Sequence, residues 1–230
     1  MPCTVALLAH TPHPDELVAA AARICYRDVT AADLLAGERE SLSEALLDQL
    51  WQSGHLSTFE HASFTFAVDG LSRVASHQLV RHRMASFSQQ SQRYVRMTGS
   101  SVIVPPSVAD MPEAEALFRR QAEAAFAAYR RLIELGVPAE DARFILPHGW
   151  ETRLVLTMNA RELHHFFHLR LCRRAQWEIR ALARQMLVLC RQEAPVLFKK
   201  AGPSCIFGAC GEVKPCGRPF KDMEDLLVED

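Results

Sequence analysis

Lysine is scarce in this sequence of 230 residues, and acidic residues are missing from one long segment. Of its 26 basic residues, 22 are arginines, and the four lysines all lie within the last 32 positions. No Asp or Glu occurs between Asp69 and Asp110, although five arginines and two histidines do. Solvated surfaces usually mix both signs of charge, and arginine is the better bidentate ligand for phosphate. We therefore expect this segment to face an anion.

Other absences exclude whole classes of protein. No apolar run reaches the roughly 18–20 residues that span a bilayer, and the N-terminus lacks the basic region of a signal peptide. We therefore expect a cytoplasmic protein that does not associate with membranes. A net charge of -1 gives no general attraction to nucleic acid. The glycine patterns of P-loop and Rossmann nucleotide sites are also missing, so side chains must bind any nucleotide.

The periodicity of apolar residues predicts an α+β fold: a single mixed domain over residues 1–200, with a sheet packed by long helices. Helices are expected at 14–26, 72–83, 112–135, 137–147, 160–171 and 174–193. A further helix, capped by Ser41 or Ser43, is expected to run to Ser53. Ser72 is expected to cap the helix at 72–83. Strands are expected at 4–10, 61–70, 94–106 and 152–159.

The C-terminal segment, residues 201–230, differs from the rest in composition. It contains Gly, Pro and three cysteines, Cys205, Cys210 and Cys216, in a C-x4-C-x5-C spacing that is not a recognised zinc pattern. We expect an extended tail with incidental thiols. The alternative is a partial metal or redox site that another subunit completes.

Histidines and serines are the remaining candidates for chemistry. His164 and His168 have the i, i+4 spacing of metal ligands, but the glutamate of a zinc-protease helix is missing between them. We expect them to line a pocket rather than to hold a metal. The serines in "RHRMASFSQQSQRY" (81–94) lie outside every recognised nucleophile motif. They are more simply hydrogen-bond partners of a phosphate or a base.

One motif is highly specific. The run from Arg81 to Arg93 fits R-H-R-x-x-S-x(4)-S-x-R and resembles the signature of the flavin-dependent thymidylate synthases. Further segments resemble that family in the same order: "ARICY", "GHLSTFEHASFTF", "ARFILP", "NARELHHFFHLR" and "AQWEIR". The resemblance covers about residues 15 to 195 and leaves out the cysteine-bearing tail.

The resemblance implies a mixed α/β fold, a homotetramer with active sites shared between subunits, and conversion of dUMP to dTMP. Methylenetetrahydrofolate would give the carbon, and FAD reduced by NADPH would give the hydride. No metal is implied. An acid-free, arginine-rich segment suits these anionic ligands. The resemblance also implies that Arg170 is catalytic and stabilises a deprotonated uracil ring by its charge.

The resemblance implies two groups of binding residues. FAD contacts are implied for Ser57, Arg81, His82, Arg83, Gln89, Asn159, Ala160, Arg161 and His165, and His55 would lie near the flavin. Contacts with dUMP are implied for Gln78, Leu79, Val80, Arg81, Gln89, Gln90, Ser91, Gln92, Arg93, Arg143 and Arg170. In the family, His165 is often Asn and Gln89 is often Glu.

The residues alone are also compatible with two other functions. The same basic stretch, with Phe87 and Tyr94 available for stacking, is also typical of a module that binds single-stranded RNA. The net charge and the further matching segments count against that reading, and we expect no nucleic-acid partner. The other alternative is a flavoprotein that has kept the fold and lost the synthase step.

Overall fold

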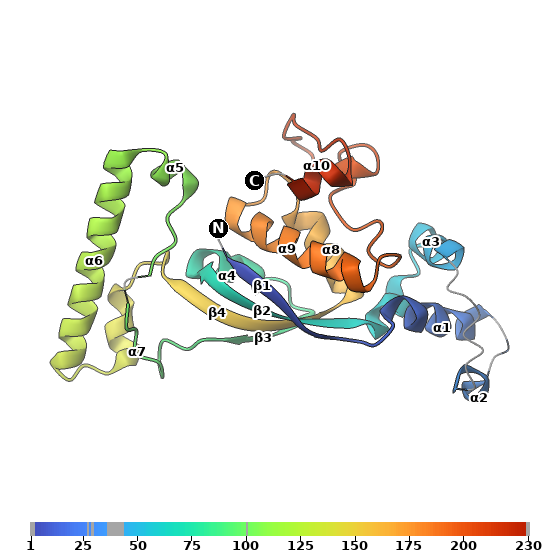
Figure 1. The fold of residues 1–230 in the computed structure, drawn as a ribbon, viewed down its shortest axis with the longest axis horizontal. Coiled ribbons are helices and arrows are strands. Elements are labelled where there is room, and N and C mark those ends of the chain that lie inside the picture. Colours follow the sequence, from blue (N-terminus) through green and yellow to red (C-terminus); the bar gives the residue numbers. More distant parts are fainter. Residues whose placement is uncertain (1–2, 27, 29, 36–43, 100, 229–230) are drawn as a thin grey trace. The chain divides into compact units, whose positions relative to one another are not determined.

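The computed structural model describes residues 3–26, 28, 30–35, 44–99 and 101–228. In these residues one sheet is formed by β1 (Thr4–His10), β2 (Ser63–Ser72), β3 (Ala85–Gln89) and β4 (Glu151–Asn159). The strand order is β1-β2-β4-β3 (Figure 1). β2 and β4 are antiparallel, because Ala160 N–H bonds to Ala62 O near one end while Arg73 N–H bonds to Trp150 O near the other. The sheet and the helices around it confirm the expected α+β class.

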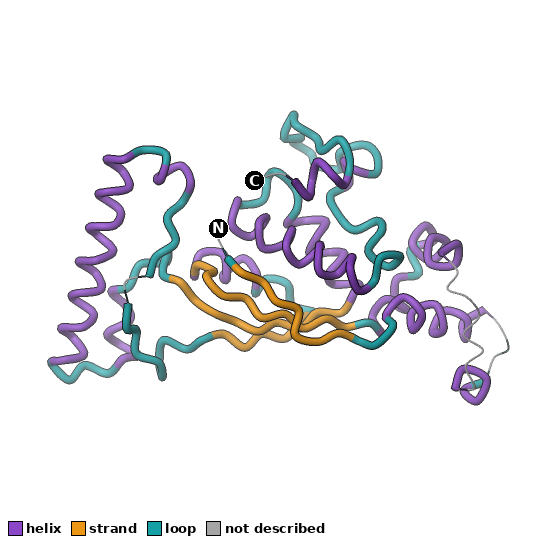
Figure 2. Tube along the Cα trace, viewed as in Figure 1, coloured by secondary structure: helices purple, strands orange, loops and turns teal. Residues whose placement is uncertain are grey.

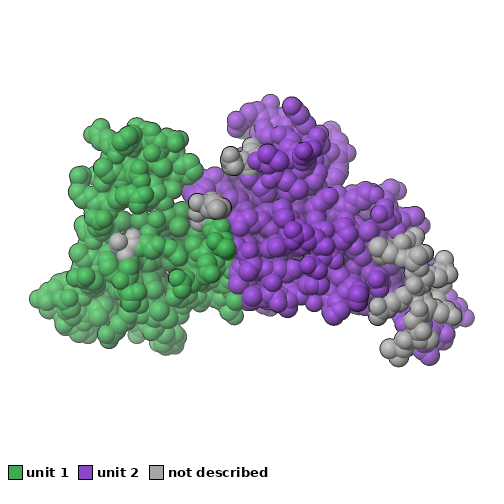
Figure 3. Space-filling view, in the orientation of Figure 1, with its two compact units in different colours: residues 1–4, 68–81, 87–155 green, residues 5–67, 82–86, 156–230 purple. Residues whose placement is uncertain are grey.

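The chain divides into two compact units that interleave along the sequence (Figure 3). Unit 1 contains residues 1–4, 68–81 and 87–155, and unit 2 contains residues 5–67, 82–86 and 156–230. The boundary between the units passes through the R-H-R run, since Arg81 belongs to unit 1 and His82 and Arg83 belong to unit 2.

Unit 1 is built around a long amphipathic helix. Its helical elements are α4 (Arg73–Leu79), α5 (Pro106–Ala109), α6 (Pro112–Glu134), α7 (Ala139–Ala142) and the 3₁₀ turn η2 (Arg143–Ile145). The predicted start of α4 is confirmed, because the Ser72 hydroxyl accepts the Ala75 N–H at 3.0 Å. α6 was also predicted and packs through Tyr129, whose hydroxyl accepts the Met97 N–H at 3.2 Å. Tyr129 and Trp150 belong to the buried core of this unit.

Unit 2 has a core rich in aromatic residues. Its helical elements are α1 (Pro14–Tyr26), α2 (Ala31–Leu35), α3 (Glu44–Ser53), η1 (Leu56–His61), α8 (Ala160–Arg170), α9 (Trp177–Glu193), η3 (Ser204–Ile206) and α10 (Met223–Val228). The expected caps of the helix that ends at Ser53, Ser41 and Ser43, lie outside the described residues. The sheet contributes Phe64 and Phe66, which are fully buried with Phe166, Phe167 and Phe198. No helix in the described part of the chain is long and apolar enough to cross a membrane.

Two sequence expectations were wrong. Residues 94–106 form no strand in their described part: Val102 makes a single isolated bridge to Trp150, and the following prolines lead into α5. The missing donors of Pro105 and Pro106 prevent pairing at the end of this segment. Conversely, β3 lies inside the recognised motif, where no strand was expected.

The segment after Ala201 also differs from the extended tail that was expected. It is mostly loop but includes η3 and α10 (Figure 2). It buries Phe220 and Leu226 almost completely. The guanidinium of Arg173 lies over the Phe220 ring at 4.2 Å from its centroid, and Arg174 pairs with Glu212 at 2.5 Å. The tail is therefore packed against the loop between α8 and α9.

Candidate active site

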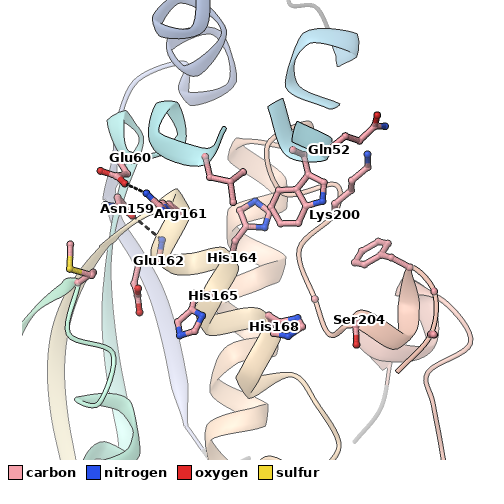
Figure 4. A pocket seen from close by; sticks show the side chains of 17 residues that line it. Gln52, Glu60, Asn159, Arg161, Glu162, His164, His165, His168, Lys200 and Ser204 are labelled. Carbon is pink, nitrogen blue, oxygen red and sulfur yellow. Dashed lines mark hydrogen bonds and ion pairs between the residues drawn. The ribbon is translucent and has the colours of Figure 1, made fainter. Parts of the chain in front are cut away.

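Helix α8 begins where β4 ends, and its first turn is fixed by a cap. The Asn159 side-chain oxygen accepts the Glu162 N–H at 2.9 Å (Figure 4). Asparagine is among the best N-cap residues because its short side chain reaches this otherwise unpaired donor. Asn159, expected to contact FAD, therefore also fixes where α8 starts. The cap determines which α8 side chains share a face.

Three polar side chains of unit 2, the buried His82 and Glu162 and the half-buried Arg170, form a chain of hydrogen bonds. His82 Nδ1 lies 2.8 Å from a Glu162 carboxylate oxygen, and Arg170 Nε donates to His82 Nε2 at 3.0 Å. Because a guanidinium can only donate, Nε2 must be the accepting nitrogen and Nδ1 must carry the proton. The order is therefore Glu162, His82, Arg170, and the imidazole between them is neutral.

The surroundings of His82 favour this neutral ring. Burial lowers the pKa of His82, the bond to Glu162 opposes that shift, and the charge of Arg170 lowers the pKa further. Burial also lowers the pKa of Arg170, yet a guanidinium stays charged in proteins. The hydrogen bond from Nε to His82 therefore holds the plane of the positively charged Arg170 guanidinium in one orientation. Sequence reasoning missed Glu162, although its position three residues after the Asn159 cap was a signal.

A large cavity lies beside α8 in unit 2, with a volume of about 1260 Å³. The expected FAD ligands Asn159, Arg161 and His165 are in its lining, together with His164 and His168 (Figure 4). The expectation that the last two histidines line a pocket is confirmed. Glu60, which was noted in the sequence together with His55, also lines the cavity. The other lining residues were not named from the sequence: Trp51, Gln52, Leu56, Met84, Glu162, Lys200, Gly202, Ser204, Phe207, Gly208 and Ala209.

The cavity offers both cations and aromatic surface. Arg161 pairs with Glu60 at 2.5 Å, and Lys200 pairs with Asp48 at 2.8 Å. Trp51 and Phe207 supply ring faces from two different segments. Such a lining suits a ligand that carries a phosphate group and a flat ring system.

The other expected FAD residues lie in varied surroundings. Arg81, Arg83 and Ser57 are exposed, whereas Ala160 is completely buried. The His55 Nδ1 atom is bonded to the hydroxyl of Tyr26. Ser57 and His55 are not in the cavity lining.

A cluster of arginines lies in unit 1. Arg93 Nε bonds to the Glu140 carboxylate at 2.5 Å, and Arg143 Nε donates to the Glu140 backbone oxygen at 3.0 Å. Two of the four arginines expected to bind dUMP, Arg93 and Arg143, thus contact the same residue although they are far apart in sequence. They form a candidate phosphate site.

Arg73 adds a third guanidinium to this cluster. Its Nη2 donates to the Gln90 backbone oxygen at 2.8 Å, while its buried Nε has no hydrogen-bond partner. Burial lowers the pKa of Arg73, and the charge of Arg143 lowers it further. Repulsion between two guanidiniums is relieved when an anion binds beside them. Sequence reasoning placed Arg73 in the acid-free segment but did not name it as a ligand.

Some of the remaining residues that were expected to bind dUMP support the fold, and others are accessible to a ligand. The Gln89 amide donates to the hydroxyls of Ser76 and Thr152, each at 3.1 Å. The Leu79 side chain is completely buried, and the Ser91 hydroxyl accepts the Arg93 N–H at 3.1 Å. Partly or fully exposed positions are Gln78, Val80, Gln90 and Gln92.

Side chains of metal-ligating type meet at one place in the described residues. Ligand atoms of His82, Glu162 and His165 lie within 4.8 Å of one another. Both ring nitrogens of His82 are already bonded, to Glu162 and to Arg170. The buried His164 ring is bonded at Nε2 to the Leu197 carbonyl oxygen at 2.9 Å. Hydrogen bonds therefore occupy both ring nitrogens of His82 and one ring nitrogen of His164.

The geometry agrees with the comparison with protein families. Residues 6–196 match the family described as "Thymidylate synthase complementing protein". Because this match covers most of the 230 residues, the chain belongs to this family, the flavin-dependent thymidylate synthases.

Named relatives agree over nearly the whole length. The chain is 54% identical to a flavin-dependent thymidylate synthase of Geobacter sulfurreducens, covering 95% of this chain and 98% of the relative. It is 49% identical to one of Nitratidesulfovibrio vulgaris, covering 93% and 94%. Among solved structures, the UMP/dUMP methylase PolB of Streptomyces cacaoi, bound with 5-Br dUMP, superposes with a TM-score of 0.74. That similarity has 29% identity and covers 86% of this chain and 93% of the other.

Proposed function

We propose that this chain converts dUMP to dTMP, with methylenetetrahydrofolate as carbon donor, and with FAD reduced by NADPH as hydride donor. The observation that carries the proposal is the pairing of two differently built sites within one chain. Unit 2 holds a large cavity lined by cations and aromatic rings, and unit 1 holds a cluster of three arginines.

The residues around the unit 2 cavity fit FAD. Its volume of about 1260 Å³ is larger than the roughly 300–1,000 Å³ of sites for drug-sized ligands. Arg161 and Lys200 would pair with the diphosphate, and Trp51 and Phe207 would contact the flat rings. When bound, the flavin supplies the hydride chemistry that no side chain can supply.

The unit 1 cluster fits the phosphate of dUMP. Arg143 and Arg93 would give charge-assisted hydrogen bonds to the phosphate oxygens, and Arg73 would add positive charge next to them. Arg93 exchanges its bond to the Glu140 carboxylate for one to the phosphate. The Ser91 hydroxyl, which already orients the Arg93 backbone, acts as a hydrogen-bond partner and not as a nucleophile.

Arg170 is the proposed catalytic residue. Its guanidinium would lie against the uracil amide and stabilise negative charge on the ring, so that carbon 5 becomes nucleophilic. His82 and Glu162 act through Arg170: they fix its Nε atom and keep the guanidinium plane in one orientation. Such preorganised charge needs no covalent attachment of the substrate.

We further propose that the chain assembles as a homotetramer with shared active sites. Ser57, which the family resemblance assigns to the FAD of a neighbouring subunit, is exposed and outside the cavity lining of its own chain. Large apolar side chains are also exposed: Phe144 is 83% and Tyr94 is 78% exposed. Burial of such residues stabilises an interface between subunits.

A crossed pair of substitutions tests the assignment of ligands to the two sites. Arg143→Ala should weaken dUMP binding and leave FAD binding unchanged, whereas Arg161→Ala should do the reverse. Each removes a charge-assisted contact of about 1.5–3 kcal/mol, or roughly ten- to hundredfold in Kd. Calorimetry with each ligand and the flavin absorbance of the purified variants measure the two affinities. If either variant loses both ligands equally while still folded, the assignment is wrong.

A further inference from the structure

Glu140 is an acidic residue that lies against two arginines of the proposed phosphate site. Its carboxylate bonds to Arg93 Nε at 2.5 Å, and its backbone oxygen accepts the Arg143 Nε–H at 3.0 Å. The two arginines come from different parts of the sequence, and both reach this one residue of α7. Any anion that binds to these guanidiniums therefore meets Glu140.

The carboxylate comes to Arg93 from a distant part of the chain. Arg93 lies between Asp69 and Asp110, in the segment that contains no acid. The fold supplies its ionic partner from α7. A carboxylate oxygen makes the same kind of charge-assisted hydrogen bond to a guanidinium as a phosphate oxygen does. The Glu140 carboxylate thus bonds to Arg93 in the way that a phosphate oxygen would.

The Arg93–Glu140 pair is accessible to water. The side chain of Arg93 is 54% exposed, and that of Glu140 is 43% exposed. An exposed ion pair adds little stability, because water also solvates the two charges when they are apart. A phosphate monoester carries about −1.5 to −2 charges at pH 7, which is more than a carboxylate carries. A phosphate can therefore displace the carboxylate from Arg93 at a small cost.

Glu140 stays beside the site after its carboxylate is displaced. The Arg143 guanidinium holds the Glu140 backbone oxygen. The Asp141 and Ala142 N–H groups both bond to the Pro138 oxygen, at 3.0 and 2.9 Å, so the backbone around Glu140 is fixed. Rotation of the side chain is the movement that this leaves. The carboxylate therefore remains within one side-chain length of the phosphate.

A carboxylate in this position acts differently on ligands of different charge. A monophosphate brings one phosphate group, which the arginines neutralise. A diphosphate brings a second phosphate group and more negative charge. Like charges repel at short range, and a binding site becomes selective when it places a repelling charge against the wrong ligand. A cluster of arginines without an acid would instead favour the more highly charged ligand.

We propose that Glu140 is a specificity-determining residue, which restricts this site to nucleoside monophosphates. The proposal rests on the proposed function, because it concerns the binding of dUMP at Arg93 and Arg143. Glu140 lowers the affinity for every phosphate by competing for Arg93, and it lowers the affinity for a diphosphate further by repulsion. The loss of dUMP affinity is thus offset by selectivity.

Ligand binding to Glu140→Gln tests the proposal. Glutamine keeps the size of the side chain and removes its charge. Calorimetry with dUMP should show binding roughly two- to fivefold tighter than in wild type, because no exposed ion pair must be broken. The affinity for dUDP should rise more, by roughly tenfold, since repulsion is also removed. Inorganic phosphate has no sugar or base, and its affinity, measured by competition with dUMP, should rise by the same factor as that of dUMP.

Glu134→Gln is the matched control. Glu134 lies in α6 of the same unit and pairs with Arg131 at 3.2 Å, in another exposed ion pair. Its substitution should leave the affinities for dUMP and dUDP as they are in wild type. Circular dichroism of each variant checks that it is folded.

Unchanged or weaker dUMP binding in a folded Glu140→Gln protein would overturn the proposal, and weaker binding would show that Glu140 positions Arg93 instead of competing for it. Wild-type protein that binds dUDP as tightly as dUMP would also overturn it, and this result needs no variant. Wild-type protein that binds neither dUMP nor inorganic phosphate would contradict the proposed function itself, and this proposal with it.

Discussion

His164 should make the protein sensitive to mild acid. Its ring is buried in unit 2, within 5.3 Å of the Phe198 ring and 4.4 Å of the Trp51 ring. Nε2 bonds to the Leu197 oxygen, while the buried Nδ1 has no hydrogen-bond partner. Protonation would place a charged N–H where no acceptor lies. Burial accordingly lowers the pKa of His164 to about 4.

The size of the effect follows from the two pKa values. The unfolded chain takes up a proton near pH 6.5, whereas the folded chain resists until about pH 4, so stability is lost as pH falls through this window. Between pH 7 and pH 5 the loss from His164 alone is about 2 kcal/mol. Above pH 7 the group contributes almost no pH dependence.

Urea unfolding at pH 7 and at pH 5 measures this loss. His164→Gln should be less stable than wild type at pH 7, because the packing is disturbed, but its decline between the two pH values should be smaller by about 2 kcal/mol. His168→Gln is the control, since His168 is an exposed ring one turn further along α8. Equal declines in wild type and His164→Gln would refute the reasoning.

Substitutions in the proposed active site should separate ligand binding from turnover. Arg170→Ala should lose activity and keep its flavin absorbance; turnover near that of wild type would contradict its catalytic role. Glu162→Gln replaces a charge-assisted hydrogen bond to His82 with a neutral one, a loss of about 1–2 kcal/mol, and kcat should fall with flavin retained. An unchanged kcat would show that the carboxylate does not position Arg170. Ser91→Ala should keep measurable turnover with a raised KM for dUMP, and complete loss of activity at normal dUMP affinity would identify a nucleophile.

Secondary structure was predicted best from the sequence where neighbouring residues along the chain determine it. The long helix from Pro112 and the cap at Ser72 depend on neighbouring residues, and both are confirmed. The strand expected at 94–106 fails because strand formation needs a partner along its length, and among its described residues only Val102 forms a bridge. β3 was missed because it is short and the polar residues of the motif are not typical of a strand.

The site was predicted as a set of residues but not as an arrangement. The family resemblance named His82 and Arg170, yet the hydrogen bond between them depends on α8 lying beside His82. Glu162 and Arg73 were missed because their roles arise from burial and from neighbours distant in sequence. The tail was read from its composition alone, which does not reveal the burial of Phe220.

The most direct test of the central claim is a turnover assay with purified full-length protein. Given dUMP, methylenetetrahydrofolate, FAD and NADPH without oxygen, the protein should form dTMP, and omission of either NADPH or the folate should abolish the product. The flavin absorbance should also bleach on addition of NADPH. Protein that binds FAD and dUMP but forms no dTMP in the complete mixture would contradict the account.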